Sequence, residues 1–242
     1  MSKKSDKITG TSPRGAFKYT HLNKPDTRYK ETGEFSVQQV IDLSTKAGKD
    51  FKAKLDDLHE QLEEKCTDAF DNAKAAQKSK WSKKGIDEPT ANLPYTEEYD
   101  ADDVPTGNII VKFKTNASFT DRKTGETVKK KVKFSDPKGN VIPTNKVPLV
   151  YAGSVGRIAY SVGFSFIPKD AEGFVSFYLN EVNLLEVVSG GGGSGSAFAD
   201  DADEDADWSV EDLEEYEGSV NDDADDEDVD DDDDDIDDEI PF

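Results

Sequence analysis

Cysteine, histidine and long apolar runs are scarce in this chain of 242 residues. Cys66 is the only cysteine, which excludes an internal disulfide and a cysteine metal cluster and fits a reducing compartment. The two histidines, His21 and His59, lie far apart without a paired-ligand motif, so we expect no metal and no cofactor. No apolar run approaches the ~20 residues of a membrane span, and residues 1–5 lack the apolar segment of a signal peptide. We therefore expect a cytoplasmic protein that does not bind a membrane.

Positive charge is missing from the last fifty-three residues, Gly190 to Phe242. They contain 26 Asp and Glu, and because the whole chain carries a charge of −23, residues 1–189 carry +3. Adjacent carboxylates repel, and the few apolar residues cannot offset the lost chain entropy. We therefore predict a Gly/Ser hinge over 190–196 and a disordered acidic tail over 197–242. Such a tethered polyanion competes, at high effective concentration, for any anion site on the rest of the chain.

The acidic tail ends in an apolar tip. A solubilising brush is the commonest role of an acidic run, but a brush has no use for an apolar end. An aromatic ring beside a terminal carboxylate is instead a compact hook for a partner pocket with a basic rim. The residues predicted to bind partner proteins are Asp237, Asp238, Glu239, Ile240, Pro241 and Phe242.

Residues 15–189 are predicted to form one mainly β domain behind a mobile polar arm, residues 1–14. Alternating apolar and polar positions predict strands over 16–22, 35–43, 109–119, 128–134, 154–168 and 174–188, with a bulge at Asn180-Glu181. Apolar residues at spacings of three and four predict one long helix, about 47–80. Five or more strands and one inserted helix fit a five-stranded antiparallel barrel, closed or nearly closed, of the oligonucleotide/oligosaccharide-binding (OB) type. Packing of the helix on its own sheet is the default, and docking of a second subunit, giving a homodimer, is the alternative.

Lysines alternate with apolar residues over 109–134. If residues 109–119 and 128–134 pair as a hairpin, their outward lysines lie on one surface, with Arg122 and Lys123 at its end. Like charges on neighbouring strands destabilise a sheet unless an anion neutralises them. This pattern favours a groove for a polyanion over a simple solvated face, which would mix charges of both signs.

Aromatic residues and cations are interleaved near the N-terminus, at Phe17, Lys18 and Tyr19 and again at Arg28 and Tyr29. Rings for base stacking and charges for phosphate are what single-stranded nucleic acid requires. An edge strand with Phe17 and Tyr19 in the core explains the first group equally well. A second cluster surrounds Trp81 with lysines at the end of the predicted helix, where the helix dipole offers a simpler explanation.

An enzyme is disfavoured, because the sequence contains no nucleophile elbow, phosphate loop, paired-histidine site or dinucleotide fingerprint. The serious alternative to a nucleic-acid-binding protein is an acidic histone-type chaperone or DNA mimic that uses the tail as its main surface for basic partners. An OB module for sugars is a third possibility, which the lysine-rich strands weaken.

Several pieces of the body, taken in order, resemble the single-stranded DNA-binding proteins of tailed bacteriophages. These pieces are Gly10-Thr11, Ala16-Phe17-Lys18-Tyr19, Lys24-Pro25-Asp26, the long helix, Phe113-Lys114, Ala117-Ser118-Phe119, Asp121 with Lys123-Thr124 and Glu126-Thr127, Asp136 with Lys138-Gly139, and Val182, Leu184 and Glu186. The resemblance implies an OB fold, protection of transient single strands in phage replication and recombination, and an acidic tail ending in Phe. The resemblance implies that Lys114 occupies a basic position of the strand with which the family binds DNA. At Asn116 and Lys169 the family's aromatic residue is replaced, so stacking falls to Phe17, Tyr19, Tyr29 or Tyr160.

The tip, Asp237 to Phe242, is also similar to the end of bacterial cellular single-stranded DNA-binding proteins. That similarity implies recruitment of replication and repair enzymes, and we expect phage and host proteins alike as partners in the cytoplasm of the bacterial host. We expect DNA binding without strong sequence preference, in replication, recombination and repair. The predicted DNA-binding residues are Phe17, Lys18, Tyr19, Lys24, Arg28, Tyr29, Lys112, Lys114, Asn116, Arg122, Lys123, Lys129, Lys131, Lys133, Arg157 and Tyr160.

Overall fold

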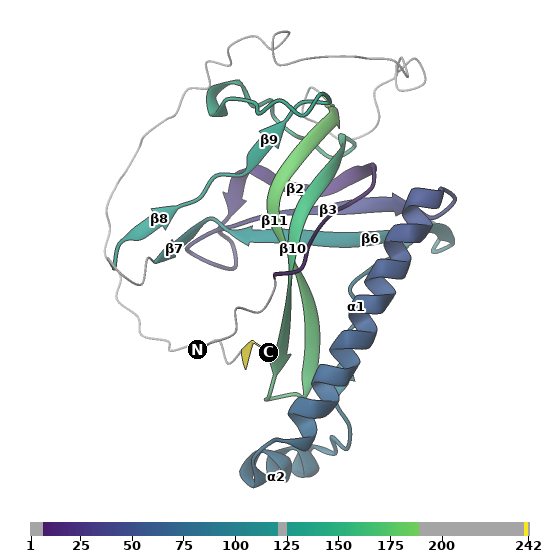
Figure 1. The fold of residues 1–242 in the computed structure, drawn as a ribbon, viewed down its shortest axis with the longest axis vertical. Coiled ribbons are helices and arrows are strands. Elements are labelled where there is room, and N and C mark those ends of the chain that lie inside the picture. The colour runs from purple at the N-terminus through teal and green to yellow at the C-terminus, as the bar shows by residue number, and fades with distance from the viewer. Residues whose placement is uncertain (1–6, 121–124, 189–239, 242) are drawn as a thin grey trace.

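The computed structural model describes residues 7–120, 125–188 and 240–241. This part of the chain is mainly β, with the long helix α1 lying along one side of the strands and the short helix α2 at its lower end (Figure 1). The predicted hinge and nearly all of the predicted tail lie outside the described residues.

Five strands pair in a closed ring, in the order β2 (Gly15–Asp26), β3 (Glu34–Asp42), β6 (Pro105–Asn116), β11 (Glu172–Glu186) and β10 (Val155–Ile167), with β10 returning to β2. Four of these pairings are antiparallel, but β6 and β11 pair in parallel. The prediction of an all-antiparallel arrangement is therefore wrong at this one junction. The bulge predicted at Asn180-Glu181 is confirmed, since the β10–β11 register shifts there.

Shorter strands extend the ring. They are β1 (Thr9–Thr11), β4 (Thr90–Ala91), β5 (Thr96–Tyr99), β9 (Lys133–Ser135) and β12 (Ile240–Pro241). Two further strands, β7 (Ser118–Thr120) and β8 (Thr127–Lys129), pair only with each other, and a 3-10 turn lies at Thr144–Lys146. Strand β1 lies within the predicted mobile arm, yet it pairs with β10, and the Ser12 hydroxyl accepts a hydrogen bond from the Ile158 amide at 2.8 Å.

The core lies inside the ring because inward residues alternate with outward ones along each strand. Its centre is aromatic: the ring centroids of Phe113, Tyr160 and Phe177 lie 5.4 to 5.7 Å apart, in tilted and edge-on arrangements. All three side chains are buried. Closely packed rings of this kind stabilise a core beyond the contribution of their buried area.

Helix α1 (Lys46–Asp71) begins where the Thr45 hydroxyl accepts a hydrogen bond from the Gly48 amide at 3.0 Å. Its apolar stripe packs on the strands, as predicted, and Cys66 is buried in that stripe. The predicted helix of residues 47–80 is instead two helices, because α1 ends at Asn72 and α2 (Ala75–Lys84) starts anew. The break lets Trp81 turn back and stack on Phe70, with ring centroids 4.5 Å apart.

The predicted hairpin between residues 109–119 and 128–134 is confirmed only at its end, where residues 118–120 pair antiparallel with residues 127–129, and it does not extend further within the described residues. Strands β7 and β8 form a short separate pair, and β9 leaves them to run parallel to β11. This path buries Phe134 in the core and sets Lys133 opposite Glu181, whereas the long hairpin would have set lysines opposite one another.

Candidate nucleic-acid interface

Two lysines of β6 lie on the outward face of the ring. Lys112 pairs in register with Gln38 of β3, and Lys114 with Ser36 of β3 on one side and Tyr178 of β11 on the other. Lys114 has a loose ion pair with Glu34, at 3.8 Å, whereas Lys112 has none with a described residue. This outward face thus carries positive charge that the described residues do not fully neutralise.

Tyr178 supplies an exposed ring beside Lys114, with 46 % of its surface accessible. It stands over Gly163 on β10, where an added Cβ would lie only 2.6 Å from the tyrosine ring. Glycine at this position therefore lets the ring lie close to the strand. The sequence prediction missed Tyr178, although its place between the buried residues Phe177 and Leu179 marks it as outward-facing.

A bulge in β2 separates Phe17 from Tyr19. Lys18 pairs with Gln38 and His21 with Ser36, so β2 has one residue more than β3 over this stretch. Tyr19 sits at the bulge with φ 47° and is 72 % exposed. Phe17 is fully buried, so the predicted sharing of one face by Phe17 and Tyr19 is wrong: only Tyr19 is available to stack on a base.

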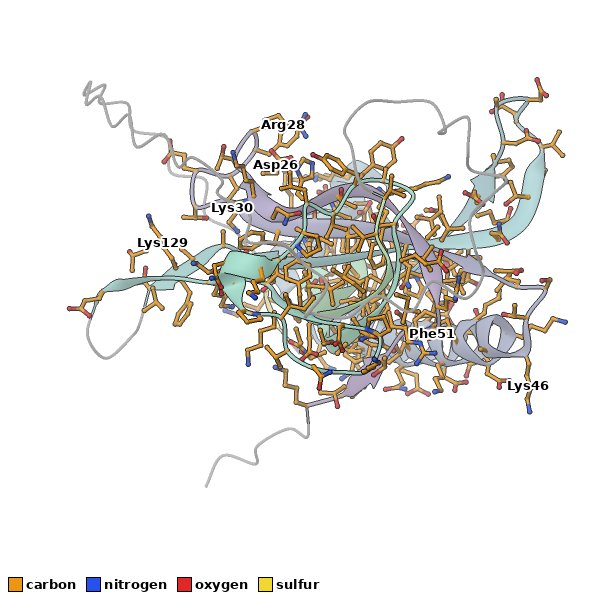
Figure 2. The ribbon with its side chains drawn as sticks, turned by 90° about the horizontal axis from the view of Figure 1, so that it is seen from above. Asp26, Arg28, Lys30, Lys46, Phe51 and Lys129 are labelled. Atoms are coloured by element: carbon orange, nitrogen blue, oxygen red, sulfur yellow. The ribbon has the colours of Figure 1, made fainter. Side chains whose placement is uncertain are left out.

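The loop between β2 and β3 presents Arg28, Tyr29 and Lys30 at one edge of the ring (Figure 2). Tyr29 is 92 % exposed, and the Arg28 guanidinium lies 5.9 Å from its ring centroid. Arg28 also donates to Asp26 at 2.9 Å, through side-chain and backbone bonds that hold the pKa of Asp26 well below its usual range. Asp26 therefore stays charged and orients Arg28 over the tyrosine.

The β7–β8 pair lies beside this loop, because the Ala117 amide donates to the Gly33 carbonyl at 2.8 Å. Phe119, predicted to face inward, is 43 % exposed, and the Lys130 ammonium lies 5.2 Å from its ring centroid. Val128, predicted inward as well, is 40 % exposed. Lys130 thus lies beside an exposed ring on a projecting pair of strands, which also carries Lys129 (Figure 2).

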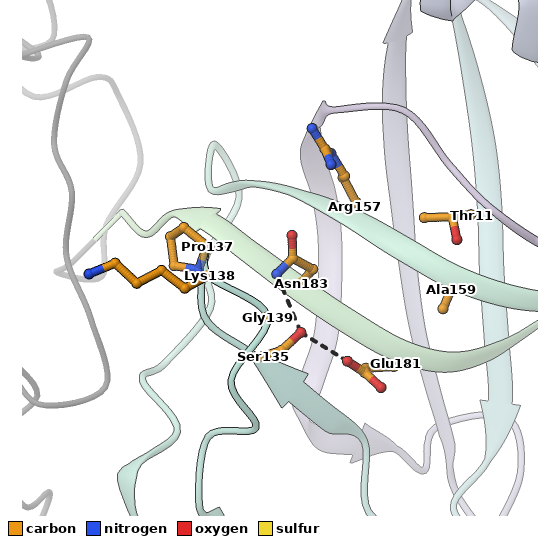
Figure 3. Close-up of a pocket in the computed structure, with 9 residues that line it drawn as sticks. All are labelled: Thr11, Ser135, Pro137, Lys138, Gly139, Arg157, Ala159, Glu181 and Asn183. Atoms are coloured by element: carbon orange, nitrogen blue, oxygen red, sulfur yellow. Dashed lines mark hydrogen bonds between the residues drawn. The ribbon is translucent and has the colours of Figure 1, made fainter.

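Arg157 and Lys138 line a hollow of about 370 Å³ farther along the outward face of β10 and β11 (Figure 3). On its floor the Ser135 hydroxyl donates to Glu181 at 2.9 Å and accepts from the Asn183 amide at 3.3 Å. Neither Arg157 nor Lys138 has an ion pair with a residue that the structure describes. The hollow therefore adds two cations, unpaired among the described residues, to the outward face, beside the carboxylate of Glu181.

Other residues that were predicted to bind DNA are buried or already lie beside carboxylates. Tyr160 is 5 % exposed and packs in the core, so it joins Phe17 among the rings that cannot stack on a base. Lys18 is paired with Glu98, and Lys133 stands opposite Glu181. Burial raises the pKa of Glu98, but hydrogen bonds from Lys18, Asn108 and Thr106 outweigh burial and lower it overall.

Lys24 and Lys131 are exposed, and Asn116 accepts a hydrogen bond from Lys30 at 3.3 Å. Arg122 and Lys123 lie outside the described residues, as do Asp237, Asp238, Glu239 and Phe242 of the tip. Trp81 is fully buried and donates to the Pro168 carbonyl at 2.7 Å, so the second predicted cluster has no ring to offer.

The described residues contain no group of acidic, histidine and cysteine side chains arranged to hold a metal ion. Among them, no helix has the length and apolar character needed to cross a bilayer.

A ring of strands with lysines, an arginine and exposed rings on its outward face is typical of proteins that bind single-stranded nucleic acid. The family described as "Single-stranded DNA-binding protein, Bacteriophage T7" matches residues 14–187, and the chain belongs to this family. Its members bind DNA and are not enzymes, and the resemblance to tailed-bacteriophage proteins is confirmed.

One relative agrees with this assignment, and two solved structures share the fold. The single-stranded DNA-binding protein of Enterobacteria phage T3 is 29 % identical over 194 residues, covering 77 % of this chain and 78 % of the relative. The crystal structure of gp2.5, a single-stranded DNA-binding protein encoded by bacteriophage T7, has a TM-score of 0.57 at 24 % identity, covering 82 % of this chain and 97 % of that one. The bacteriophage Enc34 protein in complex with single-stranded DNA has a TM-score of 0.50 at 11 % identity, covering 76 % and 89 %.

Proposed function

We propose that this chain binds single-stranded DNA without strong sequence preference and protects it during phage DNA replication, recombination and repair in the bacterial cytoplasm. Lys112, Lys114 and Arg157 would hold phosphates, while Tyr19, Tyr29 and Tyr178 would stack on bases. The closed ring would act as an OB-type barrel, whose outward face receives the strand. Contacts to phosphates and stacking on base faces, which every sequence offers, would give binding without strong sequence preference.

The observation that carries this proposal is the close association of exposed rings with cations: Tyr178 beside Lys114, Tyr29 under Arg28 and Phe119 under Lys130. A solvated surface gains nothing from exposing large rings. Stacking of a base on such a ring contributes about 1–3 kcal/mol, and it tolerates any sequence because every base has a π face.

We further propose that the acidic tail (197–242) competes with DNA for this face and that its Phe-ended tip recruits phage and host replication and repair proteins. The sequence supports this idea through the opposite charges of the two parts, −26 on the tail and +3 on the remainder. Deletion of Pro241 and Phe242 should abolish binding to those proteins and leave DNA binding intact. Unchanged binding to host repair enzymes would contradict recruitment by the tip.

The test is a titration of single-stranded and duplex oligonucleotides, by fluorescence anisotropy at two salt concentrations, against the full chain and a chain ending at residue 189. We expect the shorter chain to bind single strands more tightly, and the double variant Lys112→Ala/Lys114→Ala to weaken that binding. Lys46→Ala/Lys49→Ala, in the first turn of α1, is the matched control, and Figure 2 shows Lys46 on the opposite side of the molecule from Lys30 and Lys129.

Failure of the shorter chain to bind any oligonucleotide at low ionic strength would overturn the proposal. The chaperone alternative makes the opposite prediction. Under that reading, removal of the tail abolishes activity toward basic partner proteins.

A further inference from the structure

Strand β10 has an open edge beyond the end of β1. The Val162 amide donates to the Ile8 carbonyl at 2.9 Å, and no described residue before Ile8 continues β1 along residues 163–167. The C-terminal strand β12 occupies this edge instead, with Ile240 opposite Phe166 and Pro241 opposite Ser165 (Figure 1). The end of the chain thus extends a sheet that begins with its N-terminal residues.

The register suits a proline. In an antiparallel pair, hydrogen-bonding and non-hydrogen-bonding positions alternate. The main-chain N–H of Val162 points toward this edge. Since main-chain groups alternate in direction along a strand, the N–H of Phe166, four residues later, points toward the same edge, whereas the N–H of Ser165 points away from it. Pro241, which has no N–H, therefore lies at the position where none is needed. A shift of one residue would place the proline where the ladder requires a donor.

A lysine cluster lies where the preceding acidic residues would run. In an antiparallel pair, residues before Ile240 run toward residues after Phe166, namely Pro168 and Lys169. These two residues border a hollow of about 380 Å³ at the end of the β10–β11 hairpin, next to α2. Its lining is Gln77, Lys80, Lys83, Lys84, Pro168 and Lys169, without an acidic residue.

This lysine cluster is not explained by its own surroundings. Lys84 pairs with Asp170 at 2.9 Å, but Lys80 and Lys83 have no ion pair with the described residues. The helix dipole accounts for cations in the last turn of α2, yet Lys80 lies one turn earlier and Lys169 is on another element. Trp81, buried beneath, bonds the Pro168 carbonyl and holds α2 against the hairpin.

We propose that the tip of the tail docks on its own chain at this end of the molecule, through strand addition of Ile240–Pro241 to β10 and contact of the acidic residues 237–239 with the lysine cluster of α2 and Lys169. The dock lies beyond the proposed DNA face, because Ser165 is two residues, about 7 Å, along β10 from Gly163, over which the Tyr178 ring stands, and Lys169 is four residues farther along the chain. Main-chain pairing gives affinity, and the lysines select an acidic segment. A partner protein must compete with this dock to take the tip.

The test follows hydrogen exchange of the Phe164 and Phe166 amides by NMR in the DNA-free, full-length protein labelled with 15N-phenylalanine. Deletion of residues 240–242 should accelerate exchange of these two amides at least several-fold and leave the Phe113 and Phe177 amides unchanged. The variant Lys80→Glu/Lys83→Glu/Lys169→Glu should have the same effect. The matched control Lys46→Glu/Lys49→Glu/Lys54→Glu, which changes as much charge at the other end of α1, should not.

Charge reversal on both sides makes the test specific. Adding Asp237→Lys/Asp238→Lys/Glu239→Lys to the Glu-substituted cluster should restore the protection of Phe166. Unchanged exchange after deletion of the tip would overturn the proposal, and so would equal effects of the cluster and control variants. Protection that falls on dilution would identify a second copy of the chain as the occupant and overturn docking within one chain.

The inference builds on the proposed partner-binding role of the tip but not on DNA binding. Oligonucleotide affinity of the same variants is measured separately. Protection of Phe166 in a protein that fails to bind DNA would refute the proposed function and leave the dock standing.

Discussion

Tyr19 combines a left-handed backbone conformation with a ring almost fully in solvent. A residue other than glycine at φ 47° costs about 1–2 kcal/mol, and such strain is retained mainly where it serves a function. Here the bulge that carries the strain is also what turns the ring outward. We interpret the strained residue as the means by which β2 exposes a stacking ring next to a buried phenylalanine.

Replacement of Tyr19 tests this interpretation. Tyr19→Gly relieves the backbone strain and removes the ring, so the free energy of unfolding should be unchanged or higher by up to about 1 kcal/mol. Single-stranded DNA binding should weaken about 5- to 100-fold, the loss expected for one stacked base. Tyr19→Ala, which keeps the strain, should lose the same affinity and be the less stable of the two. Urea denaturation and anisotropy titration measure both quantities, and full affinity in both variants would exclude stacking.

Gly163 allows a second test, through the ring of Tyr178. An added methyl group would lie 2.6 Å from that ring, and the half-exposed side chain can swing away. Gly163→Ala should therefore cost less than about 1 kcal/mol of stability, because alanine also restricts the unfolded chain. It should reduce single-stranded DNA affinity nearly as much as Tyr178→Ala does. Ser165→Ala, the next outward residue on β10, is the control, and equal affinities of all three would remove Tyr178 from the interface.

Strand β5 pairs with β6, and one buried carboxylate links it to the ring as well. Glu98 accepts hydrogen bonds from Lys18, from Thr106 at 2.8 Å and from Asn108 at 2.9 Å, and it is 8 % exposed. Three donors from β2 and β6 therefore meet at one residue of β5. Lys18 lies on the outward face, but its ammonium group is held in the ion pair with Glu98 and stabilises the fold instead of binding DNA.

The lowered pKa of Glu98 makes its contribution depend on pH. Since the folded-state pKa lies below the unfolded value of about 4.3, its stabilisation is complete above that value and is lost as the pH falls toward the lowered one. Glu98→Gln should lower the free energy of unfolding by about 1–3 kcal/mol at pH 7. The difference between wild type and variant should shrink steadily below about pH 4. Denaturation at several pH values measures it, and a difference independent of pH would contradict the assignment.

The sequence predicts elements well where one periodicity runs unbroken. Strands β3, β10 and β11 and the buried stripe of α1, with Cys66, follow from alternation or helical spacing alone. The predictions fail where a long-range contact decides. The bulge at Tyr19 and the departure of β9 toward β11 each depend on a partner strand remote in sequence, and α2, which follows the break at Asn72, is held by the hydrogen bond from Trp81 to Pro168.

In the candidate site, too, the residues assigned from regular alternation were the ones that the sequence predicted well. Lys112 and Lys114 are outward because β6 alternates regularly, and alternation would also have found Tyr178. Alternation along β10 also places Tyr160 inward with Ile158 and Val162, so the prediction that its ring stacks on a base went against this pattern. Phe113 and Phe177 pack against the buried ring. The aromatic residues were therefore assigned less well than the cations.

At the scale of the whole molecule, a tail of 26 acidic residues is joined to a remainder of charge +3. Salt weakens the binding of both DNA and the acidic tail to the DNA-binding face. It screens the attraction between opposite charges, over a Debye length of about 10 Å at 0.1 M. If the tail occupies the face in the absence of DNA, binding exchanges one polyanion for another. Few counterions are then released in total.

The logarithm of the affinity should consequently fall more steeply with the logarithm of salt concentration for the chain ending at residue 189 than for the full chain. The affinity ratio between the two chains should be largest at low salt and approach one as salt rises. Lys112→Ala/Lys114→Ala in the shorter chain should reduce the slope by about 1.4, since each lost phosphate contact to a single strand contributes about 0.7. Lys46→Ala/Lys49→Ala should leave the slope unchanged. Parallel lines for the two chain lengths would mean that the tail never occupies the DNA-binding face, whatever its charge.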